Sequence, residues 1–537
     1  MQVFFGAQAM SDLPWSVSEI DQRRRRILKA AALAAGVAAF GGATRVWASA
    51  SGIPAVDRDT LVVGLDKGFA NLNGVVAVTS DSDRYTLLVF DRLFGFDKVG
   101  NLQPGLARSV EISPDGLSYT YRLREGVKFH NGAVLTAQDV KFTMAFALDP
   151  LNKSSRRAFF APYVDGVDVL DPLTVRFRLK SPDGAFQNKL AGYLPIITAN
   201  YGSTQSAVEF FARTPVATGA FRVVSLSADG TQLELERFEG YWGKRPEIRR
   251  IVFRTIKDES NRLNALLAGE IDVVVGVPPQ SVAALNASSG LSAISNPVAS
   301  PLIIRPYTSN PALPLSHREV RQALNYAIDK DAIIKTVQYG IGDSLASGIS
   351  RYYPYGADLS IKPYPYDPAK ARALLTAAGF PEGFSTKLQF PADYPKGITE
   401  AIAAYWGQVG VKTEIQLLDY PTFVLWNDTR RTTPMTVQQG ANAIYDPVHT
   451  VGGLYVKSGA WSDYSNPEVE RLFAEVAPIV DTRIRGDIFQ RIGRILHDDA
   501  AAIFLSEIHR IYARKRSLEW TPTQGTAALN FLNARWV

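Results

Sequence analysis

The sequence predicts an α/β fold with a smaller α+β segment inserted into it, and three observations support this prediction. Segments with strand character alternate with capped helical segments along most of the chain. Residues 96–204 differ, because short alternating strands and tight turns dominate there. The composition, with 46% hydrophobic and 20% charged residues among 537, is that of a globular protein with a large core.

One βαβ unit shows the alternation clearly. The runs Ile251–Thr255 and Ile271–Val275 predict two strands. Between them, Ser260 predicts the cap of a helix that ends at Gly269. Because two strands joined through a helix run in the same direction, this unit predicts a parallel arrangement.

Capping patterns predict further element boundaries. Ser316–Glu319 has the form of a capping box and predicts a helix through Ala327. Asp367 and Pro368 predict the start of another helix, and a strand is expected over Val411–Leu417. Within the inserted segment, short strands are expected at 110–112, 117–123, 127–129 and 173–179.

The composition excludes several classes of function. The chain has no Cys, so thiol catalysis, disulfides and Cys-ligated metal centres are excluded. The net charge is +6, but removing residues 1–50 leaves 52 basic and 49 acidic residues. The rest of the chain is nearly balanced, which argues against nucleic acid as a partner.

Residues 1–50 are typical of an export signal. A basic segment, Arg23–Lys29, precedes an apolar run of 14 residues, Ala30–Ala43, and the small-x-small site Ala48–Ala50. The apolar run is shorter than the ~20 residues that cross a bilayer. Arg24–Lys29 resembles the twin-arginine signal, with an ordinary Sec signal as the alternative. Both interpretations predict a mature protein that is soluble in the periplasm.

Several long motifs occur in a fixed order and together resemble one family. These motifs are Pro104–Ala107, Ser113–Gly116, Tyr119–Gly132, Leu135–Val140, Thr214–Phe221, Leu233–Arg237, Tyr241–Trp242, Val320–Lys330, Tyr366–Leu375 and Ala378–Pro381. They resemble the peptide/nickel class (family 5) of extracellular solute-binding proteins of bacterial ABC importers, which includes dipeptide- and oligopeptide-binding proteins.

The resemblance implies a two-lobed periplasmic binding protein of type II, in the large cluster that carries an extra domain. It assigns 51–95, 205–310 and 500–537 to lobe I, 96–204 to the extra domain and 311–499 to lobe II. It also implies a receptor, not an enzyme, that needs no cofactor. As a monomer it would deliver a peptide or peptide-like solute to the transmembrane subunits of an ABC permease. The same role for a sugar, an opine-like compound or a metal chelate stays open.

Four segments are expected to supply the binding site, because they follow strands or lie near the predicted hinge. Their aromatic side chains can stack on a ligand and their amides can orient it. With 11% aromatic residues in the chain, any one of these rings is also a candidate core residue. The predicted ligand-binding residues are Asp66, Phe69 and Asn71 in the first segment, after the strand Leu61–Leu65; Tyr307 and Asn310 in the second, Tyr307–Asn310; Trp426 in the third, Tyr420–Trp426; and Gln439, Asn442, Tyr445 and Asp446 in the fourth, Gln438–Pro447.

The segment Gln438–Pro447 departs from the pattern of the peptide-binding members. In those members, the resemblance implies an Asp four residues before the Pro, which pairs with the α-ammonium of the peptide. Here that position is Ala443, which has no charge. Either Asp446 or Asp66 takes over the role, or the ligand lacks a free amine, since an unpaired buried ammonium costs several kcal/mol.

A secreted serine hydrolase is the alternative from another class. Gly342–Leu345 and Asp446–His449 resemble the motifs of the Gly-Asp-Ser-Leu hydrolases, with Ser344 as nucleophile, His449 as base and Asp446 as its partner. The position of Ser344 far along the chain, after a helix, contradicts the usual context of that motif. None of the five His residues has metal-ligand spacing with another, so no metal site is expected.

Overall fold

The structure is a computed structural model that describes residues 59–69, 71–76, 83–200, 211–392, 394–429, 434–440, 442–526 and 528–537. The described residues pack as one unit. The export signal predicted for residues 1–50 lies outside the described residues. Among the described residues, no helix is both long enough and apolar enough to cross a membrane.

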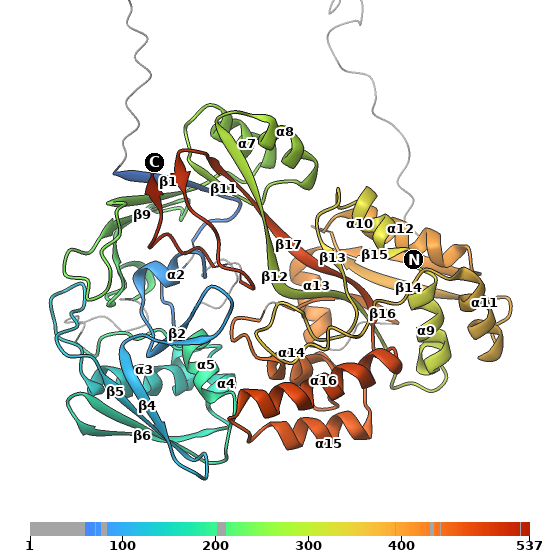
Figure 1. The fold of residues 1–537 in the computed structure, drawn as a ribbon, viewed down its shortest axis with the longest axis horizontal. Coiled ribbons are helices and arrows are strands. Elements are labelled where there is room, and N and C mark those ends of the chain that lie inside the picture. The colour runs from blue at the N-terminus through green and yellow to red at the C-terminus, as the bar shows by residue number, and fades with distance from the viewer. Residues whose placement is uncertain are drawn as a thin grey trace, which may run out of the picture. The chain divides into compact units, whose positions relative to one another are not determined.

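One large sheet of eleven strands runs through both lobes (Figure 1). Ten of its strands form a continuous path, and β13 (Asp343–Ser344) pairs with β17 beside that path. In spatial order the ten strands are β15 (Val411–Leu418), β14 (Phe384–Pro391), β16 (Met435–Gln439), β12 (Leu291–Pro306), β17 (Ile503–Lys515), β11 (Val273–Val275), β1 (Thr60–Leu65), β10 (Arg250–Thr255), β9 (Gln232–Arg237) and β8 (Phe221–Leu226).

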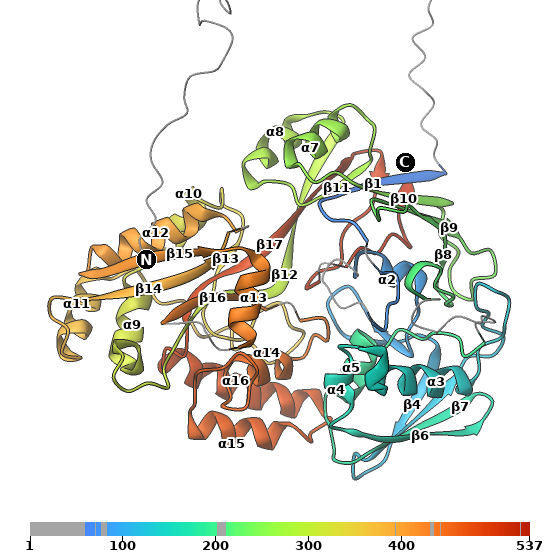
Figure 2. The same ribbon diagram turned by 180° about the vertical axis from the view of Figure 1, so that it is seen from behind.

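The long antiparallel strands β12 and β17 join the two lobes. Leu291–Pro297 of β12 pairs with β17 on the side of β11, in lobe I. Pro301–Ile304 pairs with β17 on the side of β16, a strand from the range 311–499 assigned to lobe II. The register shifts between these two stretches, and both views show the strands passing from one lobe to the other (Figures 1 and 2). Such a two-strand connection is a suitable axis for lobe closure.

The predicted βαβ unit is present, with two differences. Strands β10 and β11 are parallel as predicted, but both pair with β1, which lies between them. Helix α7 (Glu259–Leu267) is capped by Asp258, whose side chain accepts a hydrogen bond from the N–H of Asn261. The prediction of Ser260 as the cap was therefore wrong, because Asp258, another favoured capping residue, starts the helix two residues earlier.

The capping box predicted at Ser316 was also wrong. Ser316 ends a short 3₁₀ turn, and α9 (Arg318–Tyr326) begins after His317 without a side-chain cap. In contrast, Asp367 caps α11 (Pro368–Ala377) as predicted, with its side chain accepting from the N–H of Lys370.

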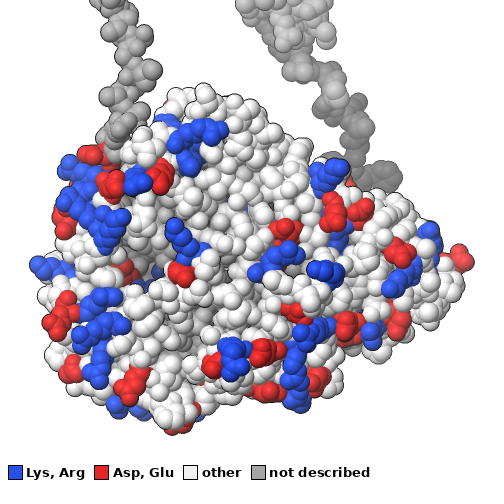
Figure 3. Space-filling view, in the orientation of Figure 1, with Lys and Arg blue, Asp and Glu red and all other residues white. Residues whose placement is uncertain are grey.

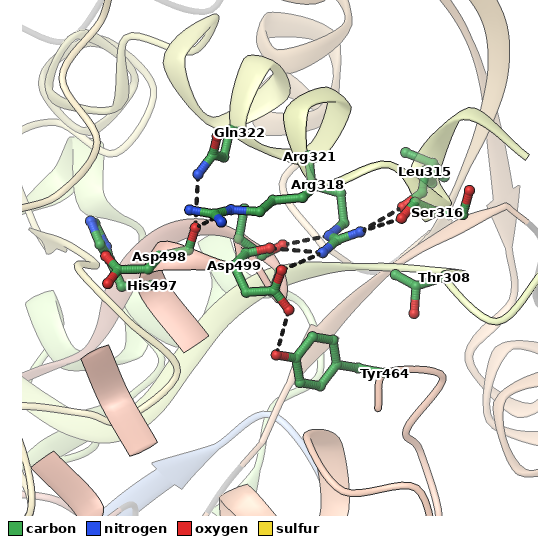
Figure 4. Close-up of polar contacts among 12 residues, drawn as sticks. Thr308, Leu315, Ser316, Arg318, Arg321, Gln322, Tyr464, His497, Asp498 and Asp499 are labelled. Atoms are coloured by element: carbon green, nitrogen blue, oxygen red, sulfur yellow. Dashed lines mark hydrogen bonds and ion pairs between the residues drawn. The ribbon is translucent and has the colours of Figure 1, made fainter. Parts of the chain in front are cut away.

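A buried polar network holds α9 against the segment that enters the hinge strand β17. The guanidinium of Arg321, which is 4% exposed, donates to the carbonyl of Asp499 at 2.8 Å and to its carboxylate at 3.1 Å. The hydroxyl of Tyr464 donates to the same carboxylate at 2.7 Å (Figure 4). Asp499 directly follows α16 (Thr482–Asp498), so the network fixes the point from which β17 starts.

A separate antiparallel sheet of four strands lies within 96–204, the segment assigned to the extra domain. Tyr119, Tyr121 and Phe177 from this sheet are buried together with Phe186. No strand forms at 127–129, where a single bridge joins Lys128 to Val134. The elements of this segment are β4 (Ala107–Ile112), β5 (Ser118–Leu123), β7 (Thr174–Leu179), β6 (Val164–Asp171), α3 (Ala137–Leu148), α4 (Arg157–Phe160) and α5 (Phe186–Tyr193).

The remaining elements cover these sheets and connect them. They are α2 (Asp83–Val89), β2 (Phe94–Phe96), β3 (Leu102–Pro104), α8 (Val282–Ala287), α10 (Lys330–Thr336), α12 (Lys396–Gly407), α13 (Tyr420–Asp428), α14 (Pro447–Leu454), α15 (Pro467–Val476), β18 (Leu518–Glu519) and β19 (Arg535–Trp536).

Candidate functional site

A cavity of about 270 Å³ lies where lobe I, the extra domain and lobe II meet. Lobe I lines it with residues at the end of α2 and with Trp242, and the extra domain with Gly192. Lobe II lines it with Ala443 and Tyr445, from one of the predicted binding segments. Since its walls come from both lobes, a solute inside the cavity contacts both, as ligand sites at domain interfaces commonly do.

The loop that contributes Ala443 is held by hydrogen bonds from Asn442 within the loop and from Asn188 in α5. The amide of Asn442 donates to the carbonyl of Asp446 at 2.8 Å, and its oxygen accepts from the N–H of Ile444. The amide of Asn188, in α5, donates to the carbonyl of Ile444 at 2.9 Å. The predicted binding residue Asn442 is thus buried and uses its amide inside the loop.

Tyr445 connects this loop to lobe I. Its backbone has a positive φ of 51°, and its ring lies 4.8 Å from the ring of Phe96. Its hydroxyl donates to the carbonyl of Gln524 at 2.8 Å. A Cβ at Gly100 would lie 2.4 Å from this ring, so the close approach requires glycine there. Tyr445 therefore forms a wall of the cavity that bridges the two lobes.

Asp446 is engaged in a buried ion pair. Its carboxylate lies 2.6 Å from the guanidinium of Arg485, and both side chains are 0% exposed. It also accepts hydrogen bonds from the hydroxyl of Tyr355 at 2.6 Å and from the N–H of Val448 at 2.9 Å. Because Arg485 already neutralises it, Asp446 is not available to a ligand cation, which removes one of the replacements considered for Ala443.

Asp66, the other replacement considered, also has a cationic partner. Its carboxylate lies 2.6 Å from the buried guanidinium of Arg84. Burial alone would raise the pKa of Asp66, but Arg84 holds it below its usual value. Next to it, the ammonium of Lys67 lies 5.8 Å from the ring centre of Tyr420 in α13. This contact brings the first and third predicted segments together across the lobes; Figure 2 shows α13 next to the hinge strands.

Two other predicted residues of the first segment lie mainly in the core. The ring of Phe69 is 6% exposed and packs edge-on against Tyr85 and Phe253. The side chain of Asn71 accepts a hydrogen bond from the N–H of Asn73 and so shapes the turn before α2. Neither residue lines the cavity.

The second segment lies at the end of β12 that is remote from the hinge. Leu302 of β12 pairs with Gln439, whereas Tyr307 lies five residues further along, about 16 Å away at ~3.3 Å per residue. Asn310 is exposed and accepts from the N–H of Ala312. The structure therefore does not bring Tyr307 and Asn310 to the cavity. Gln439 accepts a hydrogen bond from Tyr394, and Trp426 is a partly exposed residue of α13.

Comparison with known proteins decides the family. Residues 101–462 match the family described as bacterial extracellular solute-binding proteins, family 5 Middle. The chain belongs to this family. The glutathione-binding protein GsiB of Pectobacterium atrosepticum is 31% identical over 503 residues, which cover 90% of this chain and 94% of GsiB.

Solved structures of other binding proteins have the same two-lobed fold as this family 5 solute-binding protein. The periplasmic binding protein DppA of Helicobacter pylori, in complex with the peptide STSA, aligns with a TM-score of 0.76 and 24% identity over 89% of this chain and 98% of DppA. The binding protein AgaA of A. tumefaciens R10, in complex with agropinic acid, aligns with a TM-score of 0.74 and 25% identity over 89% of this chain and 99% of AgaA. The resemblance and the fold class predicted from the motifs are confirmed.

The three residues of the hydrolase alternative are separated in this solute-binding protein. The hydroxyl of Ser344 donates to Asp331, and the carboxylate of Asp446 binds Arg485. Nδ1 of His449 lies 3.3 Å from the hydroxyl of Tyr193, and burial lowers the pKa of His449 to about 4. No triad is assembled, so the structure and the family both disfavour the hydrolase. In the described part of the chain, no three His, Cys, Asp or Glu side chains gather as a metal site would require.

The sequence did not single out Asp91, which lines the cavity at the end of α2. Its carboxylate accepts hydrogen bonds from Nε1 of Trp242 at 2.7 Å, from the hydroxyl of Thr218 at 3.0 Å and from the hydroxyl of Tyr241 at 3.4 Å. Burial raises the pKa of Asp91 to about 6. A single Asp between a helix and a strand carries no signal in the sequence, because its partners lie 127 to 151 residues away.

Proposed function

We propose that this protein is the periplasmic receptor of an ABC importer and binds a peptide or peptide-like solute in the cavity between its lobes. The observation that carries the proposal is the cavity itself, whose walls come from lobe I, the extra domain and the loop at Ala443. The relative GsiB, which aligns over 94% of its length, is named for binding glutathione, a small peptide.

The hinge and the contacts across the lobes support this mechanism. A solute enclosed from both sides stabilises the closed form, and the permease subunits recognise the surface that closure creates. The ring contact of Tyr445 with Phe96 and the contact of Lys67 with Tyr420 would form in the closed form and break on opening. The solute leaves unchanged, so no catalytic group is needed.

We propose Tyr445 and Phe96 as walls that contact the solute. Trp426 and Gln439 do not line this cavity, so we propose them only as contacts for a part of the solute that extends beyond it on the lobe II side. Trp426 keeps part of its ring exposed on α13, the helix that also carries Tyr420. Asp66 and Asp446 are proposed to support the site through their ion pairs with Arg84 and Arg485.

We also propose that residues 1–50 direct export, through a twin-arginine or Sec signal that is then cleaved, and that the mature protein acts as a soluble monomer. A role with nucleic acid is not expected. Lys and Arg are interspersed with Asp and Glu on the face seen in Figure 3, and the charge without residues 1–50 is small.

Isothermal titration calorimetry of the purified protein tests this function. Glutathione and tri-alanine serve as peptide probes, and agropinic acid and a disaccharide represent the other solute classes. We expect a peptide probe to bind with micromolar or tighter affinity and to be recovered intact by mass spectrometry. Binding of only a non-peptide probe, or recovery of a cleaved peptide, would contradict the proposal.

A further inference from the structure

The cavity contains a carboxylate, Asp91, that forms no ion pair with any of the described residues. In the described chain, the three side chains that donate hydrogen bonds to it, Trp242, Thr218 and Tyr241, are all uncharged. A buried carboxylate without a cationic partner is unfavourable, because hydrogen bonds offset only part of the lost hydration. Nearby positive charge from a ligand would relieve this cost.

Arg92, the next residue, and Arg124, which stacks on Trp242, form no ion pair with Asp91 in the described chain. Arg92 also lines the cavity and lowers the pKa of Asp91 slightly, but burial has the larger effect. The guanidinium of Arg124 stacks 4.9 Å from the ring centre of Trp242 and donates to the carbonyl of Gly105. The negative charge of Asp91 at neutral pH is therefore left for a group inside the cavity.

The other walls of the cavity suit an ammonium group. Aromatic rings of Phe96, Trp242 and Tyr445 line it, and ring faces attract cations. Gly192 and Ala443 form part of the wall where the extra domain meets lobe II, and they pack closely, since a Cβ at Gly192 would lie 2.6 Å from the carbonyl oxygen of Ala443. The volume of about 270 Å³ is several times the ~30 Å³ of a water molecule, which is enough for an ammonium group with its carbon skeleton.

We propose that Asp91 binds a positively charged ammonium group of the ligand, so that the solutes of this receptor carry a free amine. The inference rests on the proposed function as a solute receptor and names the chemical class of the solute. Among the described residues, Asp91 is the carboxylate that lines this cavity, whereas Asp66 and Asp446, the two replacements considered from the sequence, are paired with arginines elsewhere.

Calorimetry at about pH 8 with tri-alanine and N-acetyl-tri-alanine tests this anchor. The wild-type protein is expected to prefer the free amine by more than about tenfold. Asp91→Asn, which keeps the size and an acceptor for Trp242, is expected to lose that preference. Thr218→Val is the matched control, because it removes one donor to Asp91 and leaves the charge in place. Thr218→Val should therefore keep the preference for the free amine. If Asp91 acted only through its structural hydrogen bonds, both variants would lose the preference to a similar extent.

A second probe separates the anchor from the peptide function. Thermal unfolding is measured in ethylammonium chloride and in sodium chloride at equal ionic strength. We expect ethylammonium to raise the melting temperature of the wild type at about pH 8, to do so less at about pH 5, and not to stabilise Asp91→Asn.

The outcomes are distinguishable. If neither peptide binds but ethylammonium stabilises only proteins that keep Asp91, the peptide function fails and the anchor stands. If the free-amine preference persists in Asp91→Asn, or if ethylammonium stabilises this variant as well as the wild type, the anchor is wrong.

Discussion

Asp446 and Asp91 are two carboxylates whose surroundings differ in one respect. Asp446 faces the buried guanidinium of Arg485 at 2.6 Å, in a part of lobe II with no exposed surface. Asp91 faces uncharged donors and the cavity. The comparison indicates that a compensated buried charge serves the fold, whereas an uncompensated one beside a cavity is available to a ligand.

The largest effect is expected from breaking the Asp446–Arg485 pair. Arg485→Met leaves a buried carboxylate without a cation, and we expect it to lower the free energy of unfolding by ~3–5 kcal/mol. Chemical denaturation measures this change. Arg471→Met is the control, because Arg471 pairs with Glu468 on the surface and each side chain is about half exposed. The control should lower the free energy of unfolding by less than ~1 kcal/mol. Equal decreases in both variants would contradict the claim that the buried pair matters more than the exposed one.

A pH-dependent effect of up to about 3 kcal/mol is expected from Asp91. Burial raises the folded pKa from 3.8 to about 6, so between these values the folded protein holds a proton that the unfolded chain releases. Relative to Asp91→Asn, the wild type should therefore gain stability as the pH falls through this window. Denaturation curves of both proteins at several pH values measure the difference. A difference that does not change with pH would show that Asp91 has an ordinary pKa.

An intermediate effect is expected where the extra domain meets the Asp446 region. The N–H of Gly184 donates to the carbonyl of Ala477 at 2.7 Å, and a Cβ at Gly184 would lie 1.8 Å from the carbonyl oxygen of Ile479. Gly184→Ala should therefore push the extra domain away from lobe II and cost ~1–3 kcal/mol. Gly126→Ala provides a comparison, since its Cβ meets nothing within 4 Å, although its positive φ adds some strain. Equal melting temperatures for the two variants would contradict the close contact at Gly184.

The smallest effect is expected at the contact between Lys67 of lobe I and Tyr420 of lobe II. Tyr420→Ala removes the ring that Lys67 faces at 5.8 Å. Because Tyr420 is 52% exposed, the contact is worth ~0.5–1 kcal/mol at most. We expect a two- to fivefold weaker affinity for the ligand with no loss of stability, measured by calorimetry and thermal unfolding. A large loss of stability would instead place Tyr420 in the core.

Local rules predicted much of this fold because they act within a few residues. Asp367 followed by Pro368 starts a helix wherever the chain allows one, and the structure confirms it. The same rules failed where two residues competed for one role, as when Asp258 caps α7 in place of Ser260. The strand order also escaped them, since β1 inserts between β10 and β11 from about 200 residues away in the sequence.

In the candidate site too, the sequence predicted some features and only the fold decided the others. The sequence predicted the segment 438–447 as part of the site, and Ala443 and Tyr445 from this segment line the cavity. It placed Asp446 among the ligand contacts, but only the fold reveals that Arg485, 39 residues later, neutralises it. It placed Phe69 there as well, although this ring packs against Tyr85 and Phe253 in the core.

By itself, the sequence determined the family and the α/β character, because long ordered motifs and helix caps are recognised along the chain. The tertiary structure alone decided which carboxylates are neutralised and which one faces the cavity. The reason is physical: the charge state of a buried group depends on what lies within a few ångströms of it, and those neighbours come from distant parts of the chain.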